Sequence, residues 1–312
     1  MSPMKPSTSI TATAPGSLML LGEHAVLHGH PALVCAIDRS IRVRLTPRAD
    51  NRLTIHSALG QYEAPLGALA DHPSFRFVLQ AIRQHAKTLP DGFDLEIESE
   101  FSSDIGFGSS AAVTVATHAA LARYCGCPFD REALFSAALE TVHAVQGRGS
   151  GADLAAAVFG GVVGYTTKPS FDPVALSLPL TAVYCGYKTP TPKVIQRVEA
   201  LRAADPQKYE QIYEEIGRSA LRAVEALRAH DFDGFGAVLN RNQELMNAMG
   251  VNTPELAEIV TALQQADGVY GAKISGSGMG DCAVGIGHAE LPELAYSVYH
   301  LNVSPEGVTL YE

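Results

Sequence analysis

The sequence has no tryptophan, few cysteines and no long apolar run. Its five cysteines are odd in number and scattered, which is not the pattern of a disulfide framework, and Cys125-Gly126-Cys127 lacks the second pair that a zinc site would need. We therefore expect a reducing, cytoplasmic environment. No stretch reaches the roughly 18 apolar residues of a membrane-spanning helix, and the first residues lack the apolar core of a signal peptide.

Positive charge is also scarce. The chain has 23 lysines and arginines against 33 aspartates and glutamates, which gives a net charge of −10. Nucleic-acid-binding proteins usually present a basic stripe, so we do not expect nucleic acid as a partner. A small anionic substrate is not excluded, because a few local donors are enough to bind it. The sequence leaves the oligomeric state open, a homodimer included.

The 312 residues are enough for one large domain or two moderate ones. Residues 9–45 are rich in Val, Ile, Leu and Thr and predict strands. Apolar residues recur at helical spacing in 73–87 and through much of 193–266, and 271–286 returns to strand and glycine-rich loop. We predict an α+β protein with a mixed N-terminal half, a helix-rich C-terminal half and a boundary near residue 180.

A glycine-rich loop directly precedes a predicted helix. It reads Gly106-Phe107-Gly108-Ser109-Ser110 and continues into small residues from Ala111. Helix N-termini carry unpaired N–H groups and about half a positive charge, so they attract phosphate. Glycine lets the backbone approach a ligand closely, and serine hydroxyls can cap the helix or bind Mg²⁺. The pattern alone fits a phosphate-binding loop and an ordinary capped helix equally well.

Two further stretches accompany this loop. Residues 14–33 contain Gly22-Glu23-His24, and residues 273–282 contain Gly276-Ser277-Gly278. In order and spacing, the three stretches resemble the motifs of the GHMP kinases, the family of galacto-, homoserine, mevalonate and phosphomevalonate kinases. The resemblance implies a two-domain fold, with an ATP-binding N-terminal domain over 1–180 and a ferredoxin-like C-terminal domain over 181–312.

The resemblance also implies roles for the residues that bind and activate the nucleotide. It assigns ATP binding to the loop residues Gly106, Gly108, Ser109, Ser110 and Ala111. It assigns Mg²⁺ binding to Ser110 and Glu140, and the catalytic role of accepting or orienting the hydroxyl proton to Asp153. Apart from the resemblance, Glu140 is interpreted as a solvated carboxylate on a helix face, and Asp153 as a partner of the helix dipole.

Substrate-binding residues follow from the same resemblance. They are Glu23, His24, Lys188, Thr191, Ser277 and Gly278. The Gly-Glu-His segment is most similar to the mevalonate kinases, in which the Glu and the His face the substrate. Lys188 and Thr191 lie where the family has a substrate loop and could hold a carboxylate or phosphate. A turn with Thr191 as the N-cap of the next helix explains these two residues equally well.

The sequence departs from the family pattern at Ser17. The mevalonate and phosphomevalonate kinases have a lysine there, beside the catalytic aspartate and the transferred phosphate. Serine cannot supply its positive charge. Either another cation reaches the site, or the rate is modest, or the substrate differs. Arg148 and Lys188 are the candidates for such a cation by their position in the sequence.

The resemblance implies an ATP- and Mg²⁺-dependent kinase that phosphorylates the 5-hydroxyl of mevalonate in isoprenoid precursor synthesis. Residues 143–153 and Gly280-Asp281-Cys282 are more similar to phosphomevalonate kinase, so 5-phosphomevalonate is the alternative acceptor. A non-catalytic nucleotide-binding homologue is supported by Ser17 and opposed by Asp153 and both glycine-rich loops. A sugar kinase would carry a galactokinase-type signature, which we do not find in the sequence.

Overall fold

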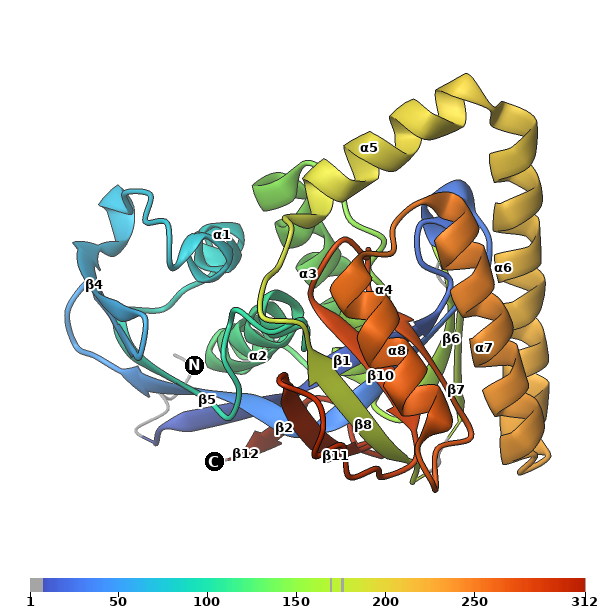
Figure 1. Ribbon diagram of the computed structural model, residues 1–312. Helices are drawn as coiled ribbons and strands as arrows, with labels where there is room; N and C mark the ends of the chain where they lie inside the picture. The colour runs from blue at the N-terminus through green and yellow to red at the C-terminus, as the bar shows by residue number, and fades with distance from the viewer. Residues whose placement is uncertain (1–7, 169, 175–176, 312) are drawn as a thin grey trace.

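Two β-sheets, each covered by helices, make up the protein (Figure 1). A computed structural model describes residues 8–168, 170–174 and 177–311. The strands are β1 (Ile10–Leu21), β2 (Ala32–Pro47), β3 (Arg52–Ser57), β4 (Gly60–Pro65), β5 (Phe93–Ser99), β6 (Val162–Thr166), β7 (Ser170–Val174), β8 (Pro179–Tyr184), β9 (Gly271–Ser275), β10 (Cys282–Ile286), β11 (Ser297–Asn302) and β12 (Thr309–Tyr311). The helices are α1 (Arg76–His85), α2 (Ser109–Tyr124), α3 (Arg131–Gln146), α4 (Ala152–Phe159), α5 (Thr191–Ala204), α6 (Pro206–Arg228), α7 (Phe232–Met249) and α8 (Pro254–Gln265), with short 3₁₀ turns η1 (Ala25–His28) and η2 (Leu66–Ala68).

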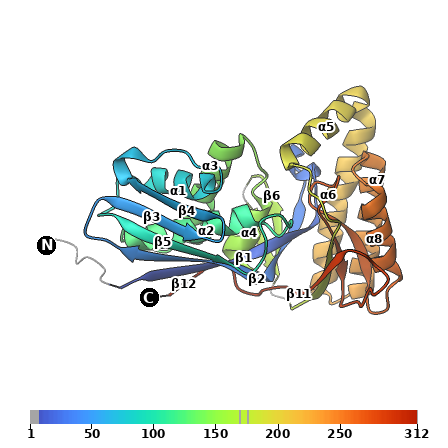
Figure 2. The same ribbon diagram turned by 60° about the vertical axis from the view of Figure 1, so that its left-hand side comes forward.

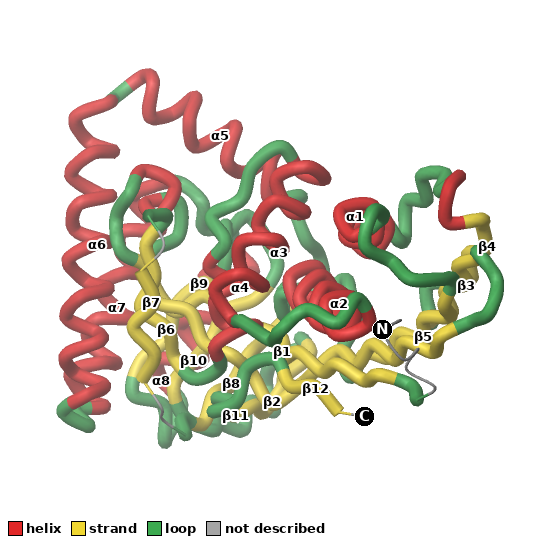
Figure 3. The backbone as a smooth tube through the Cα atoms, turned by 180° about the vertical axis from the view of Figure 1, so that it is seen from behind, coloured by secondary structure: helices red, strands yellow, loops and turns green. Residues whose placement is uncertain are grey.

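The first sheet has the strand order β12-β1-β2-β5-β3-β4, with β6 paired to β2 and β7 paired to β6. The long strands β1 and β2 run antiparallel, from the pair Ile10–Leu45 to the pair Leu21–Leu33. Helices α1 to α4 lie together on one face of this sheet (Figures 2 and 3). Helices α2 and α4 consist mostly of small buried residues, which lets them pack closely on β1 and β2.

The second sheet is antiparallel and has the order β11-β8-β10-β9. Helices α7 and α8 pack on it, and α6 packs beside α7 (Figure 1). The chain enters this sheet at Pro179, close to the predicted domain boundary near residue 180, which stays a prediction. Strand β12 crosses back and pairs with β1, so the last described residues belong to the first sheet.

Local signals in the sequence set the ends of several helices. The side chains of Asp130, Asp205, Asp231 and Thr253 accept hydrogen bonds from backbone N–H groups in the first turns of α3, α6, α7 and α8. The helical region predicted over 193–266 is thereby divided into the four helices α5 to α8. The α+β class predicted from the sequence is confirmed.

Candidate active site

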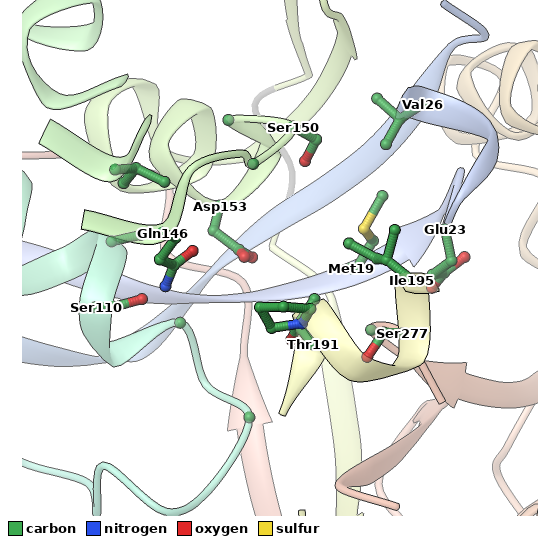
Figure 4. Close-up of a pocket in the computed structure, with 18 of the residues that line it drawn as sticks. Met19, Glu23, Val26, Ser110, Gln146, Ser150, Asp153, Thr191, Ile195 and Ser277 are labelled. Carbon is green, nitrogen blue, oxygen red and sulfur yellow. The ribbon is translucent and has the colours of Figure 1, made fainter. Parts of the chain in front are cut away.

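A pocket of about 230 Å³ brings together residues from both halves of the chain. The start of α2 and the segment that joins α3 to α4 line one part of it. The segment between β8 and α5 and the turn after β9 line another part, and the end of β1 completes it. In Figure 4, Ser110 and Asp153 lie across the pocket from Thr191 and Ser277.

The glycine-rich loop forms the entrance to α2. Gly108 has φ +67°, and a Cβ at this position would lie 2.0 Å from the Ser17 Oγ, so only glycine fits. Among the described residues no side chain caps the N-terminus of α2, and both Ser109 and Ser110 line the pocket. The amides and hydroxyls of this turn therefore form a site suited to phosphate.

Asp153 lies in the first turn of α4 and is hydrogen-bonded to β1. Its Oδ1 accepts a hydrogen bond from the Ser17 Oγ at 2.8 Å. The side chain is open to the pocket, although protein atoms enclose it, and this enclosure raises the pKa of the carboxyl above its usual value. The hydrogen bond from Ser17 and the charge of Lys188 act in the opposite direction. Asp153 is thus placed to accept or orient the proton of a hydroxyl group in the pocket.

Glu23 and Lys273 form a fully buried ion pair at the pocket wall. The Lys273 Nζ donates to the Glu23 Oε1 and to the Ile274 carbonyl. Burial raises the pKa of Glu23, and the charge of Lys273 opposes this rise. The Glu23 Oε2 is buried and has no partner among the described residues. Glu23 lines the pocket, so the ion pair forms part of the pocket wall.

His24 is held next to Glu23 in a constrained conformation. Its backbone has φ +60°, which is uncommon for a residue other than glycine. The Nε2 lies 2.9 Å from the Ser277 carbonyl oxygen, so it carries the proton and donates to this oxygen. Burial lowers the pKa of His24, which keeps the ring neutral. The first and third glycine-containing motifs are therefore bonded directly to each other.

Two cationic side chains line the pocket. The Lys188 Nζ lies 3.1 Å from the Asp281 Oδ2. The Arg148 Nη2 donates to the Pro192 carbonyl at 3.5 Å. Both side chains are exposed. These are the two cations that the sequence suggested as substitutes for a lysine at position 17.

The structure brings most of the predicted site residues to this pocket. They are Glu23, His24, Gly106, Gly108, Ser109, Ser110, Ala111, Asp153, Lys188, Thr191 and Ser277. Gly278 lies outside the lining, and a Cβ there would lie 2.6 Å from the Val251 carbonyl, so a side chain does not fit at this position. Glu140 is exposed on α3 and also lies outside the lining, as expected of a solvated carboxylate. Thr191 is the first residue of α5, whose N-cap is Pro190.

The sequence did not single out Lys273. A lysine in the middle of the short, mostly apolar strand β9 signals a buried partner, because lysine is almost never fully buried unless it is paired. That signal was present in the sequence. The identity of the partner was not, because Glu23 lies 250 positions away in the chain.

The similarity of the chain to known proteins agrees with this arrangement. The family model described as the GHMP kinases N terminal domain matches residues 75–161, and the model described as GHMP kinases C terminal matches residues 223–300. The chain is 33% identical over 303 residues to the mevalonate kinase of Archaeoglobus fulgidus, covering 96% of this chain and 99% of that protein. The chain belongs to the GHMP kinases. It is therefore an ATP-dependent kinase, and the family predicted from its three motifs is confirmed.

Solved structures show the GHMP kinase fold as well. The structure of L. major mevalonate kinase in complex with R-mevalonate has a TM-score of 0.79 and 25% identity, and the match covers 98% of this chain and 99% of that one. Phosphomevalonate kinase from Streptococcus pneumoniae has a TM-score of 0.79 and 18% identity, with 94% and 99% covered. The second likeness concerns the fold alone.

Two further findings bear on the sequence predictions. A model described as the galactokinase galactose-binding signature matches residues 4–47, which corrects our statement that the sequence lacks such a signature. This segment includes Glu23 and His24. No helix in the described part of this GHMP kinase is long and apolar enough to cross a membrane.

Proposed function

We propose that this GHMP kinase phosphorylates the 5-hydroxyl of mevalonate with Mg²⁺-ATP. The observation that carries the proposal is the position of Asp153, which shares one pocket with the uncapped N-terminus of α2 and with Glu23. A phosphate site, a base and a hydroxyl acceptor site are thus contiguous. The choice of mevalonate rests on the 33% identity to a protein that bears this activity in its name.

The reaction assigns a separate task to each of these groups. The acceptor hydroxyl oxygen forms a bond to the terminal phosphorus of ATP, the bond from that phosphorus to the bridging oxygen breaks, and ADP leaves with the bonding electron pair. Asp153 takes or orients the hydroxyl proton. The turn that begins α2 holds the phosphates, and Glu23 accepts a hydrogen bond from the substrate, so the two reactants are held in line.

Mg²⁺ would neutralise phosphate charge and prefers hard oxygen ligands, usually keeping several waters. The Ser110 hydroxyl in the pocket fits this preference. Among the described residues there is no group of three or more His, Cys, Asp or Glu side chains that could hold a metal, which fits an ion bound largely through nucleotide phosphates. The position of Glu140 outside the pocket does not support it as a second ligand.

A sugar hydroxyl is the second candidate acceptor. The galactose-binding signature over residues 4–47 favours it, because this segment supplies Glu23 and His24 to the pocket. The likeness of residues 143–153 to phosphomevalonate kinase keeps 5-phosphomevalonate as a third candidate. A homodimer and a cytoplasmic location stay predictions.

An assay of acceptor-dependent ADP release tests the proposal. The purified chain is given Mg²⁺-ATP with mevalonate, 5-phosphomevalonate or galactose, and we expect the highest kcat/KM with mevalonate. If kcat/KM were higher with 5-phosphomevalonate or galactose, that compound would replace mevalonate as the proposed acceptor. Tight ATP binding without turnover of any of them would favour a non-catalytic homologue.

A further inference from the structure

The segment that carries Lys188 is fastened to the turn after β9. The Asp281 amide donates to the Tyr187 carbonyl at 2.7 Å, and the Cys185 amide donates to the Asp281 carbonyl at 2.9 Å. On the other side of Lys188, the Thr189 Oγ1 donates to the Met279 carbonyl at 2.6 Å. The backbone around Lys188 is therefore held on both sides, and Asp281 provides two of the three contacts.

The Asp281 side chain occupies an unusual position. Its backbone has φ +72°, a conformation that costs an ordinary residue free energy and that aspartate tolerates better than most. Its carboxylate lies against the phosphate loop, since a Cβ on Gly106 would come within 2.3 Å of the Oδ2. The Oδ1 is buried and has no partner among the described residues. A carboxylate here would repel bound phosphates unless it also held a cation beside them.

Lys188 is that cation. Its Nζ lies 3.1 Å from the Asp281 Oδ2, and both side chains line the pocket together with Asp153. The charge of Lys188 lowers the pKa of Asp153, so the two groups lie within electrostatic range. Arg148, the other cation in the lining, has its hydrogen bond directed to a backbone carbonyl instead.

We propose that Asp281 is a positioning residue that holds the Lys188 Nζ toward Asp153 and the terminal phosphate of bound ATP. Lys188 then supplies positive charge where phosphoryl transfer develops negative charge, at a site where Ser17 supplies none. This inference rests on the proposed kinase function, but it does not depend on which acceptor is used.

The first test measures nucleotide affinity without turnover. Calorimetry with Mg²⁺ compares the non-hydrolysable analogue AMP-PNP with ADP, which lacks the terminal phosphate. A charge-assisted contact to that phosphate corresponds to about 10-fold or more in affinity. We expect Lys188→Met to weaken AMP-PNP binding by this factor with ADP nearly unchanged, and Lys188→Arg to retain most of the preference. The matched control is Lys193→Met on the exposed side of α5, which should change neither affinity.

If Lys188→Met bound AMP-PNP as tightly as the unmutated chain does, the proposal would be overturned. This outcome is independent of the acceptor assay. A chain that turns over no acceptor but shows the selective loss would contradict the kinase function and still support the placement of Lys188.

The second test asks whether Asp281 acts through Lys188. Asn tolerates a left-handed backbone, so Asp281→Asn keeps the turn while removing the charge. We expect Asp281→Asn to lower kcat, and the AMP-PNP preference, by about 10-fold in the native background. In the Lys188→Met background it should have little further effect, as for residues that act as one unit. If the losses of Asp281→Asn and Lys188→Met added up in the double variant, Asp281 would not act through Lys188 and the positioning role would be overturned. A raised Mg²⁺ requirement in Asp281→Asn alone would also overturn this role, because it would make Asp281 a metal ligand.

Discussion

Ser17 and Gly108 occupy adjoining positions at the centre of the site, and each depends on the other. The Ser17 hydroxyl lies where a side chain on Gly108 would have to go, and from there it donates to Asp153. The hydrogen bond favours the ionised carboxylate, which enclosure in the pocket disfavours. Ser17 therefore adjusts the proton affinity of the Asp153 carboxyl and supplies no charge.

Replacement of Ser17 by alanine should shift the pH dependence of catalysis. The pKa of Asp153 is raised above its usual value, so its base form is lost, and kcat/KM falls, as the pH drops through this raised pKa. Loss of the hydrogen bond that lowers the pKa should move this acid limb to higher pH. The measurement is kcat/KM against pH for both proteins.

Asp153→Asn is the matched control for this experiment. It keeps the shape of the side chain and removes the base, so we expect kcat to fall by about 10²–10⁴-fold and the acid limb of Asp153 to disappear. An acid limb at the same pH in Ser17→Ala and the unmutated chain would show that the hydrogen bond does not influence the base.

At the scale of one element, α2 connects the pocket to the core of the first half. Its N-terminus faces the pocket, while its small residues are buried between the sheet and the helices α1 and α3. The helix is bounded by two glycines in the left-handed region, Gly108 at φ +67° and Gly126 at φ +73° just beyond its end. Their surroundings differ, because a Cβ on Gly126 would meet nothing within 4 Å.

This difference provides a matched pair of substitutions. Gly126→Ala should cost only the left-handed backbone strain, about 1–2 kcal/mol, and leave ATP affinity unchanged. Gly108→Ala should carry the same strain and also displace Ser17 and the phosphate loop, so it should lose at least 10-fold in ATP affinity. Melting temperature and nucleotide calorimetry check both. Equal ATP affinities in the two variants would contradict the role of the Gly108–Ser17 contact.

The buried His118 and the half-buried His85 form a pair that connects α2 to its neighbours. The His118 Nδ1 lies 3.1 Å from the His85 Nε2 on α1, and the His118 Nε2 lies 2.8 Å from the Thr141 Oγ1 on α3. Burial lowers the pKa of His118 to about 3, and the proximity of His85 contributes to this. The core of the first half therefore contains a group that resists protonation.

The pair should make the fold sensitive to acid. Between pH 6.5 and about 3 the unfolded chain binds a proton at His118 that the folded chain excludes, so the free energy of unfolding falls as the pH drops. His118 can lower the free energy of unfolding by at most roughly 5 kcal/mol over this pH range. We expect His118→Gln to flatten the slope of the free energy of unfolding between pH 6.5 and 4, whatever its stability at pH 7. Urea titrations over this range measure the slope, and His56→Gln on the exposed side of β3 is the control.

For the whole molecule, the site is also the junction of the two sheets. The Glu23–Lys273 ion pair joins the end of β1 to β9, and the Ser275 Oγ donates to the Met19 carbonyl at 3.0 Å. These contacts link residues about 250 positions apart. The arrangement of the pocket residues contributed by the two halves thus depends on buried polar contacts between them.

Removal of one member of the ion pair should destabilise the molecule strongly. Lys273→Met leaves the Glu23 carboxylate buried without its partner, and we expect a loss of about 3–5 kcal/mol in the free energy of unfolding. Circular dichroism in urea is the suitable probe, because the chain has no tryptophan.

The double variant separates stability from binding. Glu23→Gln with Lys273→Met removes both charges, so it should recover much of the lost stability, because a buried ion pair can be replaced by neutral groups at little cost. Acceptor affinity should not recover, since the ionised acceptor oxygen is gone. The pairing would be contradicted if the loss of stability in the double variant equalled the sum of the losses in Glu23→Gln and Lys273→Met measured separately.

The α+β class, the glycine-rich turn that leads into α2 and the position of Asp153 at the start of a helix were predictable because each depends on residues adjacent in the chain. Hydrophobic spacing, glycine and capping side chains act over a few positions and leave a local pattern. The exposed position of Glu140, the close approach of Gly278 to Val251 and the partnership of Glu23 with Lys273 were not predictable in this way. They depend on which faces of distant helices and strands meet when the two sheets pack, and no local pattern records that choice.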